Sequence, residues 1–572
     1  MECTYFGYDT VAQIGSGADM RKNAKKIDLL IALGMNVLIL FIYTQFFALV
    51  PESNDDLAMS YFVEGVYGQY SEYLIFENVL WGKFLVFMNQ LIPAVKWYNV
   101  LMFAMVFVAF CEMTYAIIRA QGRKLGIAVS SIMLLFCGYH SYVLFQFSRV
   151  TAIATIGGMI MLFYALERAE GNMERKFCLI AGGLLSVWAS MMRFQVFGLC
   201  VVLVGGAFGF YRLYMILREK REGWIKQIVT YLAVFGTVGV VSLALYIVDW
   251  AHYETNEEWK YYKEYNEVRA DLWDTGFPDY YENYELYQSL GISENDFIYY
   301  LHWEMDEEVL TLDTLKTIQA AKTERTFDIK EFLTLFPSAY VPMSVFTVFV
   351  VLAFVTIALN KKNIYFVVYE FIGVMAFEAL FFWMNRYGVE RIDSGMWMAA
   401  SITLMYAMSD DIKNITVNTW RWTIAVVGIA ATLNFSYLSD YTNPYMGRIG
   451  TTKAVYEVIS QDKEHLYVML TKGPEIYHAY NFWEPSGEGD LSNVYNAYGW
   501  EYNINLKHDI LENYGISNIY RDGVDNEKVY FVPGAQAERL ILYVQENYYP
   551  DAQLVYEAEI MGYPVWSIKT GE

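Results

Sequence analysis

The sequence predicts a polytopic α-helical membrane protein with about eleven transmembrane helices and a small soluble α/β domain at its C-terminal end. Apolar residues make up 56% of the chain and charged residues only 18%, whereas charged residues average about 25% in soluble proteins. The apolar residues are concentrated in segments of the roughly 20 residues that a helix needs to cross a bilayer. From Gly447 onward, short runs of strand-forming residues replace these segments, which indicates a separate α/β unit.

The basic residues predict the orientation of these segments. Four of them (Arg21, Lys22, Lys25 and Lys26) precede the first segment, which places its start on the cytoplasmic side by the positive-inside rule. With this orientation, every short basic loop along the chain lies on the cytoplasmic side. The expected spans are 27–50, 98–118, 125–141, 150–166, 177–192, 195–217, 228–248, 341–359, 364–384, 395–408 and 421–438.

The same pattern predicts three parts of the chain. These are a cytoplasmic segment (1–26), a transmembrane domain (27–440) and an extracytoplasmic α/β domain (441–572). Two outer loops, 51–97 and 249–337, interrupt the transmembrane domain. In the C-terminal part, HLYVML, KVYFVP and the tail AQLVYEAEIMGYPVWSIK predict strands, and Ala537–Asn547 predicts a helix.

Composition disfavours several functions. The net charge of -22 comes from acids clustered in the outer regions, and the absence of a basic surface disfavours nucleic-acid binding. Four of the five cysteines fall in apolar runs, so we expect small buried side chains rather than a disulfide framework or a zinc site. The sequence has no Walker loop, no GxGxxG after a strand, no HExxH and no GxSxG.

The first outer loop carries the strongest candidates for chemistry. Asp55 and Asp56 follow the first span directly, where paired carboxylates can act as a general base for a hydroxyl or hold a divalent metal against a phosphate. Glu77 follows in the same loop, and Leu57–Val66 and Tyr73–Phe87 are expected to form amphipathic helices on the bilayer. The alternative is that Asn54 or Asp55 only caps the helix that follows.

Arginines at the outer ends of the spans form the second signal. Arginine at membrane depth tends to face a cavity or a partner, and its planar fork suits phosphate. The candidates are ordered Arg386 and Arg391, then Arg193, then Arg149. The alternative is that they are interfacial anchors, or are paired with acids such as Glu390 and Asp393.

His140 also lies near the outer surface. A hydrogen-bonded structural histidine is the first interpretation, and a role at the site is the second.

These features together resemble the GT-C glycosyltransferase superfamily. The resemblance rests on the acidic pair after the first span, the helices expected in that loop, about eleven spans and an outer C-terminal domain. The string NDDLAMSYFVEGVYGQYSEYLIFENVLWGKF, followed by VKWYNVLMF, is also similar to uncharacterised bacterial membrane proteins. In residues, the resemblance covers the first loop only. The family's acidic position in a later outer loop has no single match here.

The resemblance implies an inverting transfer of a sugar from a polyprenyl-phosphate donor to an acceptor hydroxyl on a glycan, lipid or protein. The first-loop acid, Asp55 or Asp56, would be the base. A divalent metal, Mg²⁺ or Mn²⁺, is a candidate cofactor, with Asp55 and Asp56 as its ligands. The expected location is a bacterial plasma membrane. A transporter or flippase for a lipid-linked glycan, or a scaffold in envelope assembly, is the alternative. Polar residues gathered at the outer surface and the lack of an internal repeat favour the enzyme.

Overall fold

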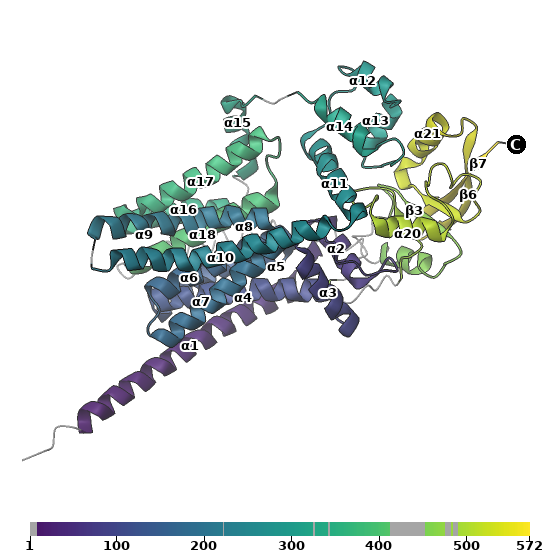
Figure 1. The fold of residues 1–572 in the computed structure, drawn as a ribbon. Coiled ribbons are helices and arrows are strands. Elements are labelled where there is room, and N and C mark those ends of the chain that lie inside the picture. The colour runs from purple at the N-terminus through teal and green to yellow at the C-terminus, as the bar shows by residue number, and fades with distance from the viewer. Residues whose placement is uncertain are drawn as a thin grey trace, which may run out of the picture.

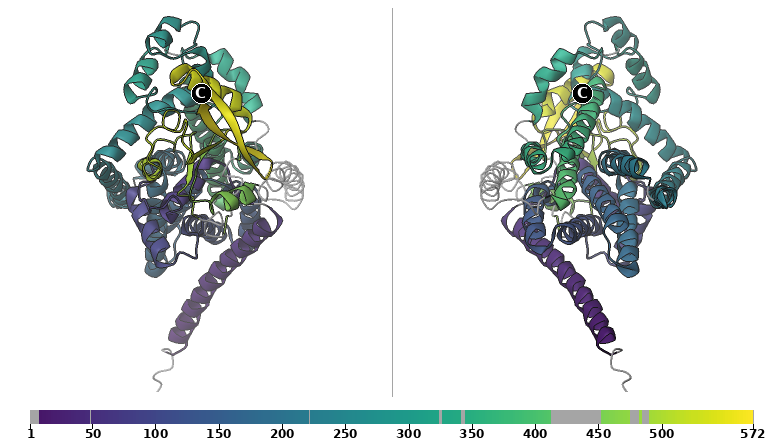
Figure 2. Two further views of the ribbon diagram at one scale, coloured as in Figure 1. Left: turned by 90° about the vertical axis from the view of Figure 1, so that its right-hand side faces the viewer. Right: turned by 90° about the vertical axis from the view of Figure 1, so that its left-hand side faces the viewer.

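The computed structural model describes residues 8–47, 49–220, 222–323, 326–340, 344–411, 452–474, 482–483 and 490–571. Long helices form a bundle at one end of the molecule, and the helices of the second outer loop and the C-terminal sheet form the other end (Figure 1). Helix α1 (Tyr8–Phe46) extends past the bundle at its N-terminal end (Figure 2). It runs without a break through the expected division at residue 26.

In the described part of the chain, seven helical segments are long and apolar enough to cross a membrane. They are Asn23–Phe46 within α1, α4 (Trp97–Gln121), α5 (Arg123–Tyr142), α6 (Phe147–Glu167), the continuous segment Phe194–Glu219, α10 (Trp224–Tyr253) and Lys361–Trp383, which contains α17 (Ile364–Trp383). Three more helices stand where spans are expected: α7 (Asn172–Met192), α16 (Ser344–Leu359) and α18 (Glu390–Ala407). The polytopic membrane fold is therefore confirmed. The last expected span, 421–438, lies outside the described residues.

The bundle is packed around α6, which is buried along nearly its whole length. Glycines allow α6 and α7 to touch: a Cβ atom added at Gly158 would lie 2.2 Å from Ser186 Oγ and 2.8 Å from the Gly182 carbonyl oxygen. Small residues at such crossings let two helix backbones approach closely within a membrane. The cysteines among the described residues are buried and unpaired, as the sequence predicts: Cys111, Cys137, Cys178 and Cys200.

The segment Phe194–Glu219 is not a regular α-helix. It consists of α8 (Phe194–Cys200), a π-helical turn (Val201–Gly205) and α9 (Gly206–Glu219). Tyr369 of α17 donates a hydrogen bond to the Val202 carbonyl oxygen at 2.9 Å. The π-turn is therefore held by a side chain from a neighbouring helix.

The first outer loop folds inward rather than along the membrane. Strand β1 (Val50–Pro51) pairs in parallel with β2 (Leu144–Phe145), which places the following residues beside the start of α6. A helix is present where the sequence predicts one over Leu57–Val66, as α2 (Asn54–Glu64), but it is buried from Asp56 to Val63, so its expected position on the bilayer surface is wrong. The C-terminal domain covers it: the Leu491 amide donates to the Val66 carbonyl oxygen at 2.9 Å.

The second expected amphipathic helix of this loop is present in a shorter form. It begins at Val79 rather than Tyr73 and forms α3 (Val79–Leu91). One face of α3 is buried, and the opposite face exposes an apolar stripe of Leu80, Phe84, Phe87 and Leu91.

The second outer loop is helical. It contains α11 (Glu257–Thr275), α12 (Tyr284–Ser289), α13 (Glu294–Leu301), α14 (Leu312–Ala320) and α15 (Ile329–Tyr340).

The C-terminal domain contains a five-stranded sheet in the order β4-β3-β5-β7-β6, with strands at Val494–Asn496, Leu466–Met469, Val529–Val532, Tyr563–Thr570 and Ala552–Ile560. Strands β4, β3 and β5 are parallel, and β7 and β6 are antiparallel. The predicted strands and the helix α21 (Ala537–Asn547) are confirmed, whereas β4 and α20 (Asn505–Asn513) are not predicted by the sequence. The expected boundary at residues 440–441 lies outside the described residues.

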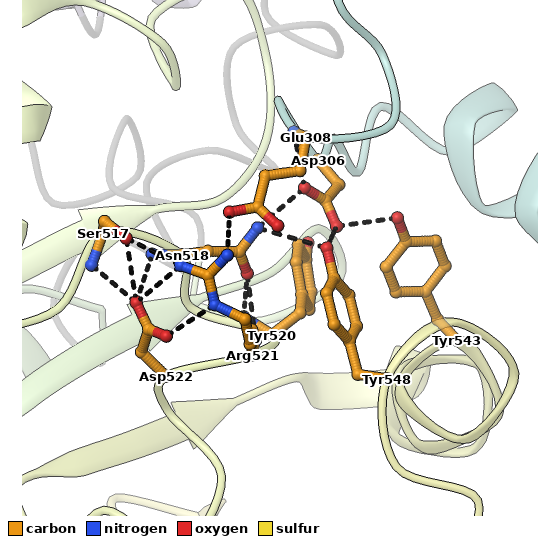
Figure 3. A network of polar contacts seen from close by, with 9 residues as sticks. All are labelled: Asp306, Glu308, Ser517, Asn518, Tyr520, Arg521, Asp522, Tyr543 and Tyr548. Carbon is orange, nitrogen blue, oxygen red and sulfur yellow. Dashed lines mark hydrogen bonds and ion pairs between the residues drawn. The ribbon is translucent and has the colours of Figure 1, made fainter.

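The second outer loop and the C-terminal domain are joined by buried polar contacts (Figure 3). Asp306 of the loop accepts hydrogen bonds from Tyr543 at 2.9 Å, Tyr548 at 2.6 Å and Asn518 at 2.9 Å. Glu308 forms an ion pair with Arg521 beside them. A carboxylate buried at this interface is stable only while these donors stay in place, so the loop and the domain hold each other in position.

Candidate functional site

Four chain segments meet at the end of the bundle nearest the C-terminal domain. The β1–α2 segment carries the acids, and the other three carry arginines: the start of α6, the α7–α8 junction and the α17–α18 turn. A cavity of about 300 Å³ lies beside them. Among the residues lining it are Glu77, Asn78, Arg193, Asp249, Lys263, Asn266 and Arg386. Two predicted arginines and one predicted acid therefore share one cavity.

The two aspartates of the predicted pair have different surroundings. Asp56 is fully buried, and its Oδ1 accepts hydrogen bonds from the Tyr98 hydroxyl at 3.1 Å and the Phe147 amide at 3.0 Å. The same Tyr98 hydroxyl lies 2.9 Å from Glu77 Oε1. Burial raises the pKa of Asp56 and of Glu77 well above the ordinary range, and the negative charges of Asp55 on Asp56 and of Asp56 on Glu77 raise them further. Asp56 therefore belongs to a buried, proton-holding cluster.

Asp55 is only partly buried. The Ser53 hydroxyl donates to Asp55 Oδ2 at 3.2 Å, and the charge of Asp55 acts on both Arg193 and Arg269. The N-cap position of α2 is Ser53, and no side-chain hydrogen bond caps the helix. The interpretation of Asn54 or Asp55 as the cap is therefore wrong, and Asp55 is the member of the pair whose charge acts on these arginines.

Two of the four predicted arginines are neutralised by acids. Arg149 is fully buried, with Nε 3.1 Å from Glu52 Oε2 and Nη2 3.5 Å from Glu390 Oε1. Arg386 pairs with Asp274 at 3.1 Å. The ion-pair alternative raised by the sequence thus holds for Arg149 with Glu390. It also holds for Arg386, with an acid from the second outer loop.

The other two predicted arginines, Arg193 and Arg391, have no carboxylate within ion-pair distance in the part of the chain that the structure describes. Arg193 donates from Nη1 to the Ser148 hydroxyl at 2.9 Å, and its guanidinium lies 4.9 Å from the centre of the Phe147 ring. Burial, followed by the positive charges of Arg391 and Arg386, lowers the pKa of Arg193 to about 10. Cations held close together, two of them without an ion-paired carboxylate among the described residues, favour a bound anion.

The structure adds residues that the sequence does not single out. Arg269 of α11 is buried over the Trp303 ring, and its Nε and Nη2 both donate to Asn266 Oδ1, at 3.1 and 2.9 Å. Lys263 and Asp249 form an ion pair of 3.4 Å in the cavity wall. The second loop holds many acids and bases, and only the packing of α11 against the bundle distinguishes these from the rest.

His140 lies apart from the cavity. It is buried near the end of α5, edge-on to Tyr139, and it is not among the residues lining the cavity. Its position fits the structural interpretation, with Arg149 nearby.

The acidic pair has no further metal-ligating side chains grouped with it among the described residues. Among the described residues there is no group of three or more His, Cys, Asp or Glu side chains that could hold a metal ion. Asp56 already accepts two hydrogen bonds through Oδ1. The Mg²⁺ or Mn²⁺ ion expected at Asp55 and Asp56 stays a prediction, since such an ion can be held by one or two carboxylates together with water and phosphate.

The fold and this site define a polytopic membrane protein with a polar, arginine-lined cavity next to an α/β domain. It is similar in structure to ArnT from Cupriavidus metallidurans, both in the apo state and bound to undecaprenyl phosphate, at 9% and 10% sequence identity. Each comparison covers 94% of this chain and 97% of that chain, with a TM-score of 0.41. A TM-score of 0.41 describes a partial similarity of shape and assigns no function to this chain. No family model matches the sequence, and no curated protein matches it.

Proposed function

We propose that this chain is a membrane glycosyltransferase that moves a sugar from a polyprenyl-phosphate donor to an acceptor hydroxyl, with inversion at the anomeric carbon. One observation carries the proposal: the charge of a partly buried carboxylate, Asp55, acts on Arg193, and Arg193 has no carboxylate within ion-pair distance among the described residues. This arrangement suits a reaction that needs a base at one end and a place for a leaving phosphate at the other.

The donor phosphate would lie at Arg193 and Arg391. Both come from the ends of membrane helices, where a phosphate carried on a lipid also lies. Their guanidinium groups can each form two parallel hydrogen bonds to phosphate oxygens. The resemblance of the first loop to GT-C enzymes favours a polyprenyl chain as the lipid.

The sugar would occupy the cavity beside the phosphate. Its walls offer hydrogen-bond donors and acceptors at Asn78, Asp249, Lys263 and Asn266, which suit a hydroxyl-rich ligand. The buried pair of Arg269 and Asn266 fixes the orientation of that amide.

In the proposed reaction, Asp55 takes the proton of the acceptor hydroxyl. The acceptor oxygen forms a bond to the anomeric carbon as the bond from that carbon to the phosphate oxygen breaks. The electron pair leaves with the phosphate, and Arg193 and Arg391 stabilise its growing negative charge. Fixed charges of this kind act strongly in a site that excludes water.

The acceptor would be a glycan, lipid or protein on the extracytoplasmic side of a bacterial plasma membrane. The N-terminus would be cytoplasmic and the C-terminal domain outside, because the basic turns then face the cytoplasm. The apolar helices fit an integral membrane location.

The test is transfer by purified protein in liposomes. Undecaprenyl-phosphate donors carrying a labelled pentose, hexose or N-acetylhexosamine are supplied with membrane extracts as the acceptor source. We expect cleavage of one donor class, with stoichiometric release of undecaprenyl phosphate. Movement of intact donor across the liposome membrane without cleavage would instead support the transporter. If neither cleavage nor movement is measured, the scaffold is the alternative that remains.

A further inference from the structure

A second cavity, of about 590 Å³, lies at the opposite end of α10 from the candidate site. The end of α6, the first turn of α7, the end of α9 and the start of α10 surround it. Helix α10 has 30 residues, and at 1.5 Å per residue its two ends are about 45 Å apart. The second cavity is therefore on the other membrane surface from the candidate site.

One wall of this cavity is fixed by an internal ion pair. Arg212 donates from Nε and Nη2 to the two oxygens of Glu167, and the Tyr231 hydroxyl donates to Glu167 Oε1 at 3.1 Å. These contacts use the charge of Arg212, so Arg212 shapes the wall and is not the binding group.

Two other cations in the wall are unpaired. Arg175 belongs to the first turns of α7, and Lys226 belongs to the first turn of α10. No carboxylate lies within ion-pair distance of either one in the described ranges. Trp224, an aromatic residue of the type enriched at the membrane surface, also lines this cavity. At this depth of the membrane, the anion nearest to these two bases is the phosphate of a lipid headgroup.

The cavity also contains negative charge. Glu222, in the turn before α10, has no ion-pair partner among the described residues. A ligand with a phosphate alone would meet repulsion from it. A ligand carrying a phosphate and an ammonium group two carbons apart would satisfy charges of both signs.

We propose that this cavity binds the headgroup of a phospholipid with a primary ammonium group, of the phosphatidylethanolamine type. The phosphate lies against Arg175 and Lys226, and the ammonium group lies against Glu222. The site is separate from the proposed transfer reaction and does not depend on it.

The test measures which lipids the purified protein retains. The full-length protein is exchanged into nanodiscs with equal amounts of phosphatidylethanolamine, phosphatidylcholine and phosphatidylglycerol, and bound lipid is counted by native mass spectrometry after release. We expect retained phosphatidylethanolamine to exceed the other two. Arg175→Gln and Lys226→Gln should each weaken its retention by about tenfold, the loss of one charge-assisted hydrogen bond.

Matched controls are Lys176→Gln and Arg218→Gln, exposed bases next to the cavity that do not line it. They should retain lipid as the parent does, and the unfolding temperature of each variant confirms that it is folded. Glu222→Gln should remove the preference over phosphatidylcholine and leave phosphate binding in place. Equal retention in the cavity and control variants would overturn the site. Equal retention of the three lipids by the parent would overturn the headgroup assignment.

Discussion

Tyr98 has one hydroxyl proton and two carboxyl neighbours. It lies 3.1 Å from Asp56 and 2.9 Å from Glu77, and it can donate to only one of them at a time. The other carboxyl group must supply its own proton or remain charged and buried. The raised pKa values of both acids show that the protonated form is favoured. The cluster therefore stores a proton in the wall of the site.

This cluster predicts how stability depends on pH. The folded pKa values of Asp56 and Glu77 lie above the ordinary values of 3.8 and 4.5, so the folded state binds more protons than the unfolded state above about pH 4. Their contribution to stability is complete below that pH and is lost as pH rises through the raised values. We expect the unfolding temperature to fall with rising pH, and Asp56→Asn with Glu77→Gln to flatten this fall. Glu559→Gln, on an exposed strand, should leave the slope unchanged.

The two aspartates should respond differently to replacement. Asp55→Asn removes the proposed base, and loss of a general base typically lowers kcat by about 10²–10⁴. The amide oxygen of Asp56→Asn can still accept from Tyr98 and Phe147, so transfer should stay within a few-fold of the parent. Asp56→Ala leaves the Phe147 amide unpaired and should cost about 1–3 kcal/mol of stability. Loss of transfer in Asp56→Asn, with activity retained in Asp55→Asn, would reverse the two roles.

The loss of lipid-phosphate binding on replacing each arginine should depend on whether that arginine is already ion-paired. Arg193→Lys keeps the charge but loses the two parallel hydrogen bonds and the contact with Phe147, so we expect binding of undecaprenyl phosphate to weaken by about tenfold. Arg386→Lys should have a smaller effect, because Asp274 already neutralises Arg386. Equilibrium binding of the lipid to both variants checks this order. A larger loss in Arg386→Lys would restore the order expected from the sequence.

At the scale of helices and strands, the sequence predicts the elements whose position depends on a local residue pattern. The lengths of the apolar segments and the basic turns between them locate α4, α6 and α10. Each of these helices must be long and apolar enough to cross the bilayer and must form its own backbone hydrogen bonds. The burial of α2 could not be predicted, since its cover comes from residue 491 and its neighbours, more than 400 positions away. Short β4 was missed for the same reason: its three residues become a strand only beside β3.

The candidate site shows the same division. The first-loop acids and the outer arginines could be predicted because each lies just outside an apolar segment. The sequence could not predict which arginines form ion pairs, because the acids that neutralise Arg386 and Arg149, Asp274 and Glu52, come from other segments of the chain. Only the folded arrangement identifies Arg193 and Arg391 as the two that have no ion-paired carboxylate among the described residues.

The contact between α9 and α17 supports a test at the scale of helices. A Cβ atom at Gly206 would lie 2.1 Å from the Tyr369 hydroxyl oxygen, which holds the π-turn through Val202. Gly206→Ala should therefore displace Tyr369 and cost about 1–3 kcal/mol, the usual effect of overpacking. Its unfolding temperature should fall, and adding Tyr369→Phe should recover part of the loss. Gly209→Ala, with nothing within 4 Å of its Cβ, is the control. Equal stability of the two alanine variants would show that α17 moves aside freely.

At the scale of the whole molecule, the two cavities lie at opposite ends of the helical bundle, and the C-terminal domain is at the end that holds the candidate site (Figure 1). The buried contacts of Asp306 fix that domain to the second outer loop (Figure 3). The orientation of the bundle in the membrane therefore decides which surface carries the proposed chemistry.

Single cysteines placed at the two ends can determine this orientation. Met561, in the turn between β6 and β7, and Met173, in the first turn of α7, are both exposed, and the four described native cysteines are buried. In a Cys3→Ser background, Met561→Cys should react with an impermeant thiol reagent on intact cells. Met173→Cys should react only after permeabilisation, because the α6–α7 connection and the start of α7 carry the bases Arg168, Arg175 and Lys176, and basic segments of this kind face the cytoplasm. The reverse pattern of labelling would place the C-terminal domain and the candidate site in the cytoplasm, where the sugar would have to come from an inward-facing donor.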